Sequence, residues 1–331
     1  MANPQKQPLW RNEVTQNGHL DTCNHLIYRK ITFLLQNPAE NRRFVFKGIS
    51  LTKFNRCFKN DEDCYEYISN IKWDNNSFVC KRCGHTHYCK GNLPFSRRCT
   101  RCKHDESPTA GTVFEKIKFP ILTAFHIIFD ICRLEKDTSS AMLSKEYDIR
   151  QKTIWAFKRK MQLSLNSQGV NILEGVVFVS SFCIDTQREF EKNDNVLIAG
   201  EILPNGQIGR AYGCYIEHIS QPYIQMFFAL HISIKAKVYT IKDKDYKLYP
   251  ANYNIEKNDN HSVLDVIHAH ILNVKGWLYG IHRRLSTKYL QGYLNEYYYR
   301  FNGRDNKNIA FDNAIMLMVY NHPIRDSIKT Q

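Results

Sequence analysis

Residues 80–102 read CKRCGHTHYCKGNLPFSRRCTRC and contain two Cys-x2-Cys pairs separated by fifteen residues. A Cys-x2-Cys turn presents two thiolates to one metal ion, and two such turns complete a closed tetrahedral four-sulfur site. This spacing predicts a zinc ribbon that binds structural Zn²⁺. The predicted ligands are Cys80, Cys83, Cys99 and Cys102. Because four thiolates saturate a tetrahedral ion, we expect the neighbouring His85, His87 and Cys89 to be bystanders.

The ribbon sequence is strongly basic. From Cys80 to Lys103 it carries seven Lys or Arg residues and no acid, and the whole chain of 331 residues has a net charge of +14. A small metal-stapled hairpin with this charge suits a phosphate backbone. We therefore predict that it contacts double-stranded DNA through Arg97, Arg98 and Arg101.

Composition argues against two other classes of protein. Eleven cysteines would suit a secreted, disulfide-rich protein, but the chain is long, rich in ordinary core residues and without an apolar signal core in its first thirty residues. The best candidate for a membrane span, Ile121–Cys132, is too short. The sequence therefore predicts a soluble, cytoplasmic protein with no membrane partner.

Residues 119–166 predict a helix-turn-helix. A buried helix over Pro120–Cys132 is followed by a helix that Thr138 and Ser139 can cap, and then by a second helix over Arg150–Leu163. The second helix of such a motif reaches base edges with its N-terminal residues and phosphates with the remainder. The predicted DNA-binding residues are Arg150, Lys152, Lys158, Arg159 and Lys160.

We expect small Ala141 to let the two helices cross closely, and Ile149 and Trp155 to fill the core between them. The alternative is a solvated basic helix in an ordinary helical domain. The basic ribbon beside it in the sequence favours the DNA-binding interpretation.

Beyond Asn166 the pattern changes to strands, beginning with Gly175–Ile184, Val196–Leu203 and Ile208–Ile216. Hairpin strands followed by a strand–helix alternation are the order of an RNase-H-like fold, one α/β option among several. We predict an α+β chain with an extension (1–45), a zinc ribbon (46–118), a helix-turn-helix (119–166), an RNase-H-like mixed-sheet domain (170–322) and a tail (323–331).

Several segments carry a family resemblance from about Phe46 to Val319. They include FKGIS (46–50), DEDCYEY (61–67), CKRCGH (80–85), PFSRRCTRC (94–102), ESPTAGTVF (106–114), QKTIW (151–155), NVKGWLYGIH (273–282) and LQGYLNEYYYRFN (290–302). The chain resembles the bacterial insertion-sequence transposases of the IS1595 family, which are related to eukaryotic Merlin elements.

The resemblance implies a zinc ribbon and helix-turn-helix that bind the terminal inverted repeats of a mobile element. It also implies an RNase-H-like domain that cuts and joins DNA with two Mg²⁺ or Mn²⁺ ions held by acidic residues. Such proteins are bacterial, associate with the nucleoid when bound to DNA, and usually act as multimers on paired ends, so a homo-oligomer is expected.

The chain departs from the family pattern at the catalytic acids. The family's first Asp lies in a Val-Asp-Glu-aromatic motif, which Val179–Phe182 matches with Ser180 and Ser181 in place of both acids. Its second Asp follows a Val-x-Thr strand end, and here Ile241 stands in that position. Magnesium prefers carboxylate ligands, so the resemblance predicts degenerate catalysis.

The third motif is better preserved. By position, Asn273 and Lys275 are the third ligand and the group that steadies phosphate, with His268 as an alternative ligand; the alternative is a helix with merely hydrogen-bonded polar groups. Asp185 or Asp243 could substitute for the missing acids, although two ligands would then have to shift together.

Two hypotheses follow. The protein is either a transposase with weak or lost strand cleavage, or a non-catalytic zinc-ribbon and helix-turn-helix DNA-binding protein. A purely structural zinc-ribbon protein accounts for the cysteines but not for the basic helix.

Overall fold

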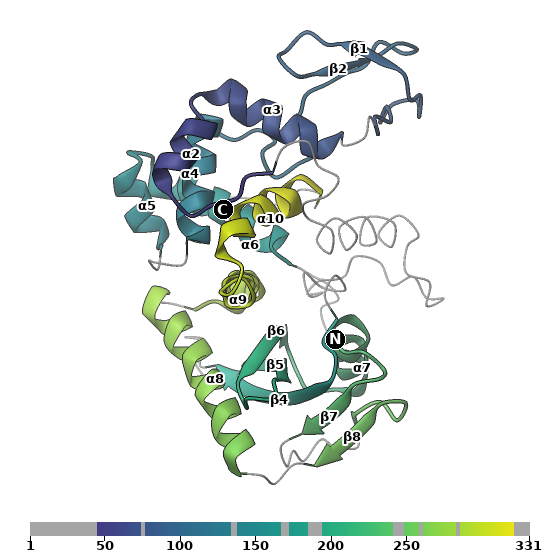
Figure 1. Ribbon diagram of the computed structural model, residues 1–331, viewed down its shortest axis with the longest axis vertical. Helices are drawn as coiled ribbons and strands as arrows, with labels where there is room; N and C mark the ends of the chain where they lie inside the picture. The colour runs from purple at the N-terminus through teal and green to yellow at the C-terminus, as the bar shows by residue number, and fades with distance from the viewer. Residues whose placement is uncertain are drawn as a thin grey trace, which may run out of the picture.

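The computed structural model describes residues 45–73, 77–133, 138–166, 172–184, 194–240, 248–257, 261–282 and 285–320. A zinc-ribbon hairpin lies at one end, a helical unit follows it, and a sheet flanked by helices lies at the other end (Figure 1). No helix within the described ranges is long and apolar enough to cross a membrane. The predicted tail lies outside these ranges, as does the N-terminal extension apart from Val45.

The ribbon is a small antiparallel sheet with the order β1-β2-β3. Its strands are β1 (Tyr88–Lys90), β2 (Arg97–Cys99) and β3 (Asp105–Glu106). Two helices precede it, α2 (Leu51–Cys57) and α3 (Asp61–Lys72). Helix α3 begins where the Asn60 side chain accepts a hydrogen bond from Asp63 N, and three acids in its first turn favour the helix dipole.

The helical unit contains α4 (Ile121–Cys132), α5 (Ser140–Glu146), α6 (Gln151–Ser164) and α10 (Lys307–Tyr320). Its core is a cluster of aromatic rings centred on Phe311 of α10, which contacts Phe46, Phe54, Phe125 and Phe129 at centroid distances of 5.3–5.9 Å. The last described helix therefore shares its core with the first described helices, not with the sheet.

Strands form the second unit, in the order β6-β5-β4-β7-β8. They are β4 (Val176–Ile184), β5 (Asp194–Ile202), β6 (Ile208–Ile216), β7 (Lys237–Thr240) and β8 (Asn254–Lys257). The first three strands pair antiparallel, and β7 and β8 run parallel to β4. This mixed order confirms the predicted RNase-H-like sheet. The Pro204-Asn205-Gly206 turn joins β5 to β6, with Gly206 at φ 78°.

Helices cover both faces of this sheet (Figure 1). Helix α7 (Gln221–His231) packs against one face, and α8 (His261–Ile281) with α9 (Thr287–Asn302) packs against the other. Along β4, Phe178 and Phe182 face α8 and α9, whereas Val177 and Val179 face α7, as the period of two in a strand requires.

The predicted helix pair corresponds to α5 and α6, with the Ser139 side chain capping α5 by accepting from Met142 N. The predicted packing between them was wrong in two details. Ala141 is exposed. Trp155 contacts the ring of Tyr289 on α9 at 5.1 Å, because one side of α6, which also carries Arg159 and Gln162, packs against α9. The buried residues of the pair include Leu143 and Ile154.

Two of the predicted DNA-binding residues on α6 are buried. Lys158 and Arg159 are each only 4% exposed. Lys158 Nζ forms an ion pair with Glu296 Oε1 of α9 at 3.2 Å, and the Arg159 guanidinium donates to the carbonyl oxygens of Lys288 and Tyr289. Their charges therefore join the helical unit to the sheet unit, which corrects the prediction that this face of α6 is exposed.

We expect Lys158→Met to destabilise the protein by about 3–5 kcal/mol, because it leaves the Glu296 carboxylate buried without its cation. Lys158→Met/Glu296→Gln should recover much of that loss. Urea unfolding followed by circular dichroism measures both. Lys152→Met, at an exposed position of the same helix, is the matched control and should change little. A Lys158→Met protein as stable as the Lys152→Met protein would remove the structural role of this pair.

Candidate functional site

The four predicted zinc ligands form one compact cluster. Cys80 Sγ lies 3.5 Å from Cys102 Sγ, Cys83 Sγ lies 3.6 Å from Cys99 Sγ, and all four sulfurs lie within 4.8 Å of one another. With Zn–S bonds of about 2.3 Å, the edge of a tetrahedral site is about 3.8 Å. The separations between the sulfurs therefore fit a single structural Zn²⁺.

The two Cys-x2-Cys turns share the same backbone geometry. Gly84 N donates to Cys80 O at 2.8 Å, and Lys103 N donates to Cys99 O at 3.1 Å. In each turn the first cysteine's N–H donates at 2.9 Å to the carbonyl oxygen five positions later. Gly84 and Lys103 both have left-handed φ angles, 70° and 58°. The sequence repeats one metal-binding turn, although only the first has the glycine that this conformation favours.

The backbone also prepares the thiols for metal. Burial acts to raise the pKa of Cys99, but hydrogen bonds from the backbone N–H groups of Cys102 and Arg101 and from the thiols of Cys83 and Cys102 together outweigh it, and the pKa falls to about 7. Because the thiolate is the metal-binding form, this environment favours zinc binding at neutral pH.

The neighbouring candidate ligands stand apart from the cluster. Among the residues that the structure describes, the only group suited to hold a metal ion is the set of four cysteines. His85 Nε2 lies 3.1 Å from Thr100 Oγ1 and its ring stacks on His87, while Cys89 is exposed. These three residues are bystanders, as predicted.

The three ribbon arginines differ in accessibility. The Arg97 guanidinium lies 4.8 Å from the ring centroid of Trp73 and 4.0 Å from that of Tyr88, and burial lowers its pKa. Arg97 therefore braces the ribbon against the end of α3 through cation–π contacts. Arg98 is half-buried and Arg101 is exposed. Arg101 is the member of this set most available to a phosphate.

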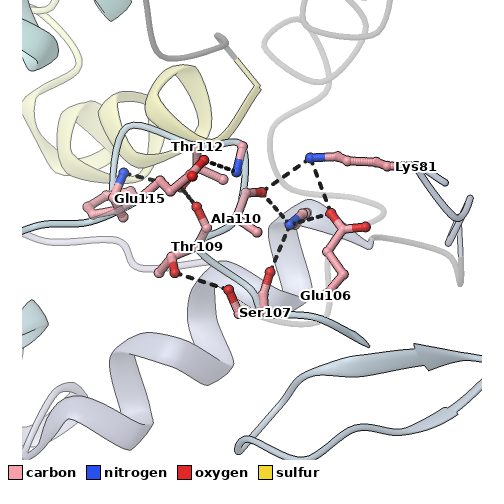
Figure 2. A network of polar contacts seen from close by, with 10 residues as sticks. Lys81, Glu106, Ser107, Thr109, Ala110, Thr112 and Glu115 are labelled. Atoms are coloured by element: carbon pink, nitrogen blue, oxygen red, sulfur yellow. Dashed lines mark hydrogen bonds and ion pairs between the residues drawn. The ribbon is translucent and has the colours of Figure 1, made fainter. Parts of the chain in front are cut away.

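A polar network fixes the ribbon to the helical unit (Figure 2). The buried Glu106 carboxylate pairs with Lys72 of α3 at 2.8 Å and with Lys81 of the first cysteine turn at 3.2 Å. Lys72 also donates to the carbonyl oxygens of Ser107 and Ala110, and burial lowers its pKa to about 8 despite the Glu106 carboxylate. The sequence analysis did not predict this network. Three of its residues, Glu106, Ser107 and Ala110, lie in the segment ESPTAGTVF (106–114), which carries part of the family resemblance.

A second candidate site lies on the face of the sheet that α8 and α9 cover. Ser180 is 3% exposed and occupies this face of β4 between Phe178 and Phe182. Ser181 points to the opposite face because side chains alternate along a strand. From α8, Lys275 Nζ lies 5.5 Å from the ring centroid of Phe182. The structure therefore brings Lys275 to the same strand face as Ser180.

The other residues of the third motif are not brought there by any described contact. Asn273 and His268 are exposed on α8. His270 of this helix is buried, and the centroid of its ring lies 4.8 Å from that of Phe301. Burial lowers the pKa of His270 to about 4. His270 is thus a neutral core residue. Ile241, Asp185 and Asp243 lie outside the described residues.

Comparison with known proteins agrees with both halves of this arrangement. Residues 59–105 match the family model described as a transposase zinc-ribbon domain, and residues 196–302 match the ISXO2-like transposase domain. The chain belongs to the IS1595 family of transposases. The second match begins within β5, so β4 and Ser180 precede it. No curated protein matches this transposase.

We expect Cys102→Ser to lose zinc and Cys89→Ser to retain it, because Cys102 lies in the sulfur cluster and Cys89 is exposed outside it. Metal analysis of the purified transposase variants measures the zinc content. Chelation of zinc from the natural protein should likewise unfold the ribbon. Equal zinc loss in both variants would contradict the ligand set.

Proposed function

We propose that this transposase binds duplex DNA at the terminal inverted repeats of its element, as a homo-oligomer on paired ends, and that its metal-dependent strand cleavage and joining are impaired. The buried Ser180, in the place of the family's first catalytic Asp, is the observation that carries the impairment.

DNA binding is supported by basic residues on two elements. Arg101 is exposed on the ribbon, and Arg150 and Lys152 are exposed at the start of α6. The turn before α6 contains Asp148 at φ 51°, a conformation that Asp tolerates. Because Lys158 and Arg159 bind α9, the N-terminal end of α6 is the part available to a DNA groove.

We expect DNA affinity to fall steeply as salt rises, because phosphate contacts release counterions. Lys152→Ala should weaken binding and reduce the slope of log K against log [salt] by about 1. Fluorescence anisotropy over a series of salt concentrations, on duplexes from the gene's own flanks, measures both quantities.

Ile234→Ala is the control, because Ile234 is 59% exposed in the sheet unit, remote in sequence from the basic elements. Its affinity and slope should match those of the natural protein. An affinity that barely changes with salt would contradict a phosphate-binding role for the ribbon and α6.

The chemistry expected of the family needs carboxylates that Ser180 does not supply. In-line attack on a phosphodiester uses divalent ions to activate the attacking oxygen and to stabilise the leaving one. Mg²⁺ and Mn²⁺ prefer carboxylate oxygens, whereas a serine offers a neutral hydroxyl. Ser180 does not fit the role of a first ligand, and Lys275 near the same strand contributes a positive charge instead.

The sheet around Ser180 remains well packed, which favours a protein retained for binding. On the α8 face, Phe178, Ile198 and Leu294 are fully buried, and Val177, Ala199 and Phe228 are fully buried on the α7 face. Packing of the sheet therefore does not require the missing carboxylates.

We expect Ser180→Asp/Ser181→Glu/Ile241→Asp to gain Mg²⁺- or Mn²⁺-dependent nicking and strand joining that the natural protein lacks. The restored acids would also raise the melting temperature when Mn²⁺ is added, because bound metal stabilises the folded state. A gel assay on the gene's flanking ends measures cleavage, and a thermal melt measures metal binding.

Ser180→Asn/Ser181→Gln/Ile241→Asn provides similar side-chain volumes without charge and should remain inactive and insensitive to Mn²⁺. Cleavage by the natural protein would overturn the proposed impairment and direct attention to Asp185 or Asp243.

A further inference from the structure

The tip of the β1–β2 hairpin presents apolar side chains to solvent. Leu93 is 61% exposed, Phe95 is 37% exposed, and Pro94 between them is also exposed. The zinc site does not need them, because the small apolar cluster around its cysteines is built from Trp73, Phe78 and Tyr88. The hairpin therefore has an apolar tip that its own core does not use.

The backbone holds this tip at a conformational cost. Ser96 N donates to Leu93 O at 3.1 Å, which closes a four-residue turn with Pro94 at its second position. Phe95, at the third position, has a φ of 57°. Proline followed by a left-handed residue is the pattern of a type II turn, whose third position favours glycine. A phenylalanine at this position is strained. Strained residues of this kind cluster at functional sites, which indicates a role for the Phe95 side chain.

Several contacts make the tip rigid. Ser96 Oγ lies 3.0 Å from Leu93 N and 2.8 Å from Leu93 O, and Asn92 N donates to Asp105 Oδ2 at 2.7 Å. A Cβ added to Gly91 would lie 2.2 Å from Ser96 Oγ, so the backbone and this side chain are closely packed. A rigid tip loses little conformational freedom on binding.

The charge around the tip selects its partner. Lys90 is exposed on β1, Arg98 is half-buried on β2, and Arg101 is exposed beyond it. The stretch from Cys80 to Lys103 carries seven basic residues and no acid, and the one carboxylate that contacts the tip in the described contacts, that of Asp105, is bonded to Asn92 N. Proteins that bind the minor groove of DNA often insert apolar side chains between base pairs while nearby basic groups contact phosphates. The exposed apolar tip with basic residues around it has the same combination of groups.

We propose that Leu93 and Phe95 form an apolar wedge that inserts at a base step of the bound duplex and kinks it. This inference rests on the proposed DNA binding. Insertion costs least free energy at flexible pyrimidine–purine steps, so the wedge would favour DNA sequences that contain such a step at the kinked position.

The experiment compares full-length Leu93→Ala and Phe95→Ala proteins with the natural one on duplexes from the gene's flanks. Each duplex carries 2-aminopurine at one of a series of positions across the bound segment. We expect one position to brighten when the natural protein unstacks it, and the signal to be lost in the variants. Affinity should fall by about tenfold or more, as for loss of an aromatic–base stack.

Salt dependence separates the wedge from the phosphate contacts. The tip variants should keep the natural slope of log K against log [salt], because an apolar insertion releases no counterions. Arg101→Ala is the matched phosphate-contact variant and should reduce the slope by about 1.

Phe95→Gly tests the strained position without damage to the turn. Glycine adopts a left-handed φ freely, so this variant should hold zinc at least as well as the natural protein while it binds DNA as weakly as Phe95→Ala. Weak DNA binding accompanied by zinc loss in Phe95→Gly would show a role in ribbon folding instead, and would overturn the wedge.

The remaining outcomes are also decisive. If the natural protein binds DNA and the tip variants match it in affinity and 2-aminopurine signal, the wedge is wrong while the proposed function stands. If the natural protein binds no DNA at any salt concentration, the proposed function fails. If light scattering shows that the tip variants lose self-association while binding DNA normally, the tip contacts a second copy and the wedge is overturned.

Discussion

The buried ion pair between Lys158 of α6 and Glu296 of α9 is the contact on which the joining of the two units depends. Neither charge is stable in an apolar interior unless its partners are complete. Lys158 also donates to Thr138 O at 2.5 Å, and Glu296 accepts from Gln162 at 2.7 Å. Helix α9 lies between the helical unit and the sheet (Figure 1). One side of it packs on the sheet through residues such as Leu294, so a single helix sets how the two units meet.

The helical unit is not a continuous segment of chain, because α10 follows the whole sheet unit in the sequence. After α9 the chain leaves the sheet, and α10 places Phe311 among the aromatic rings of α2 and α4. Backbone bonds close this arrangement, from Gly48 N to Asn308 O at 2.8 Å and from Val113 N to Met318 O at 3.0 Å. The predicted domain at 170–322 includes α10, but the side chains of α10 lie in the core of the helical unit. The whole sheet unit lies between α6 and α10 in the sequence, so the chain connects the helical unit to the sheet unit at both ends of the latter.

The sequence predicted best where one physical requirement fixed the residues. Metal coordination demands four sulfurs at set spacing, and half-buried strands demand alternation, so the ribbon and β6 were placed closely. Helix α10 was missed because apolar side chains surround it, which removes the helical period. Strand β8, NIEK at the sheet edge, carries too little apolar signal. The buried Lys158 and Arg159 resembled a DNA-binding face because a run of basic residues does not specify whether its partner is a phosphate or a carboxylate from a distant helix.

The proposed loss of catalytic carboxylates is compatible with the intact sheet for an electrostatic reason. A carboxylate at the 3% exposed position of Ser180 would be costly without a bound cation, because a buried charge loses its hydration. Serine is smaller and neutral, and the β4–β5 pairing of Ser180 with Ile198 uses only backbone groups. Catalytic sites commonly reduce the stability of the folded state, so replacing a buried catalytic carboxylate by serine is expected to raise that stability. The fold can therefore persist after the proposed loss of catalysis, and the proposed DNA-binding role needs no compensating change elsewhere in the sheet.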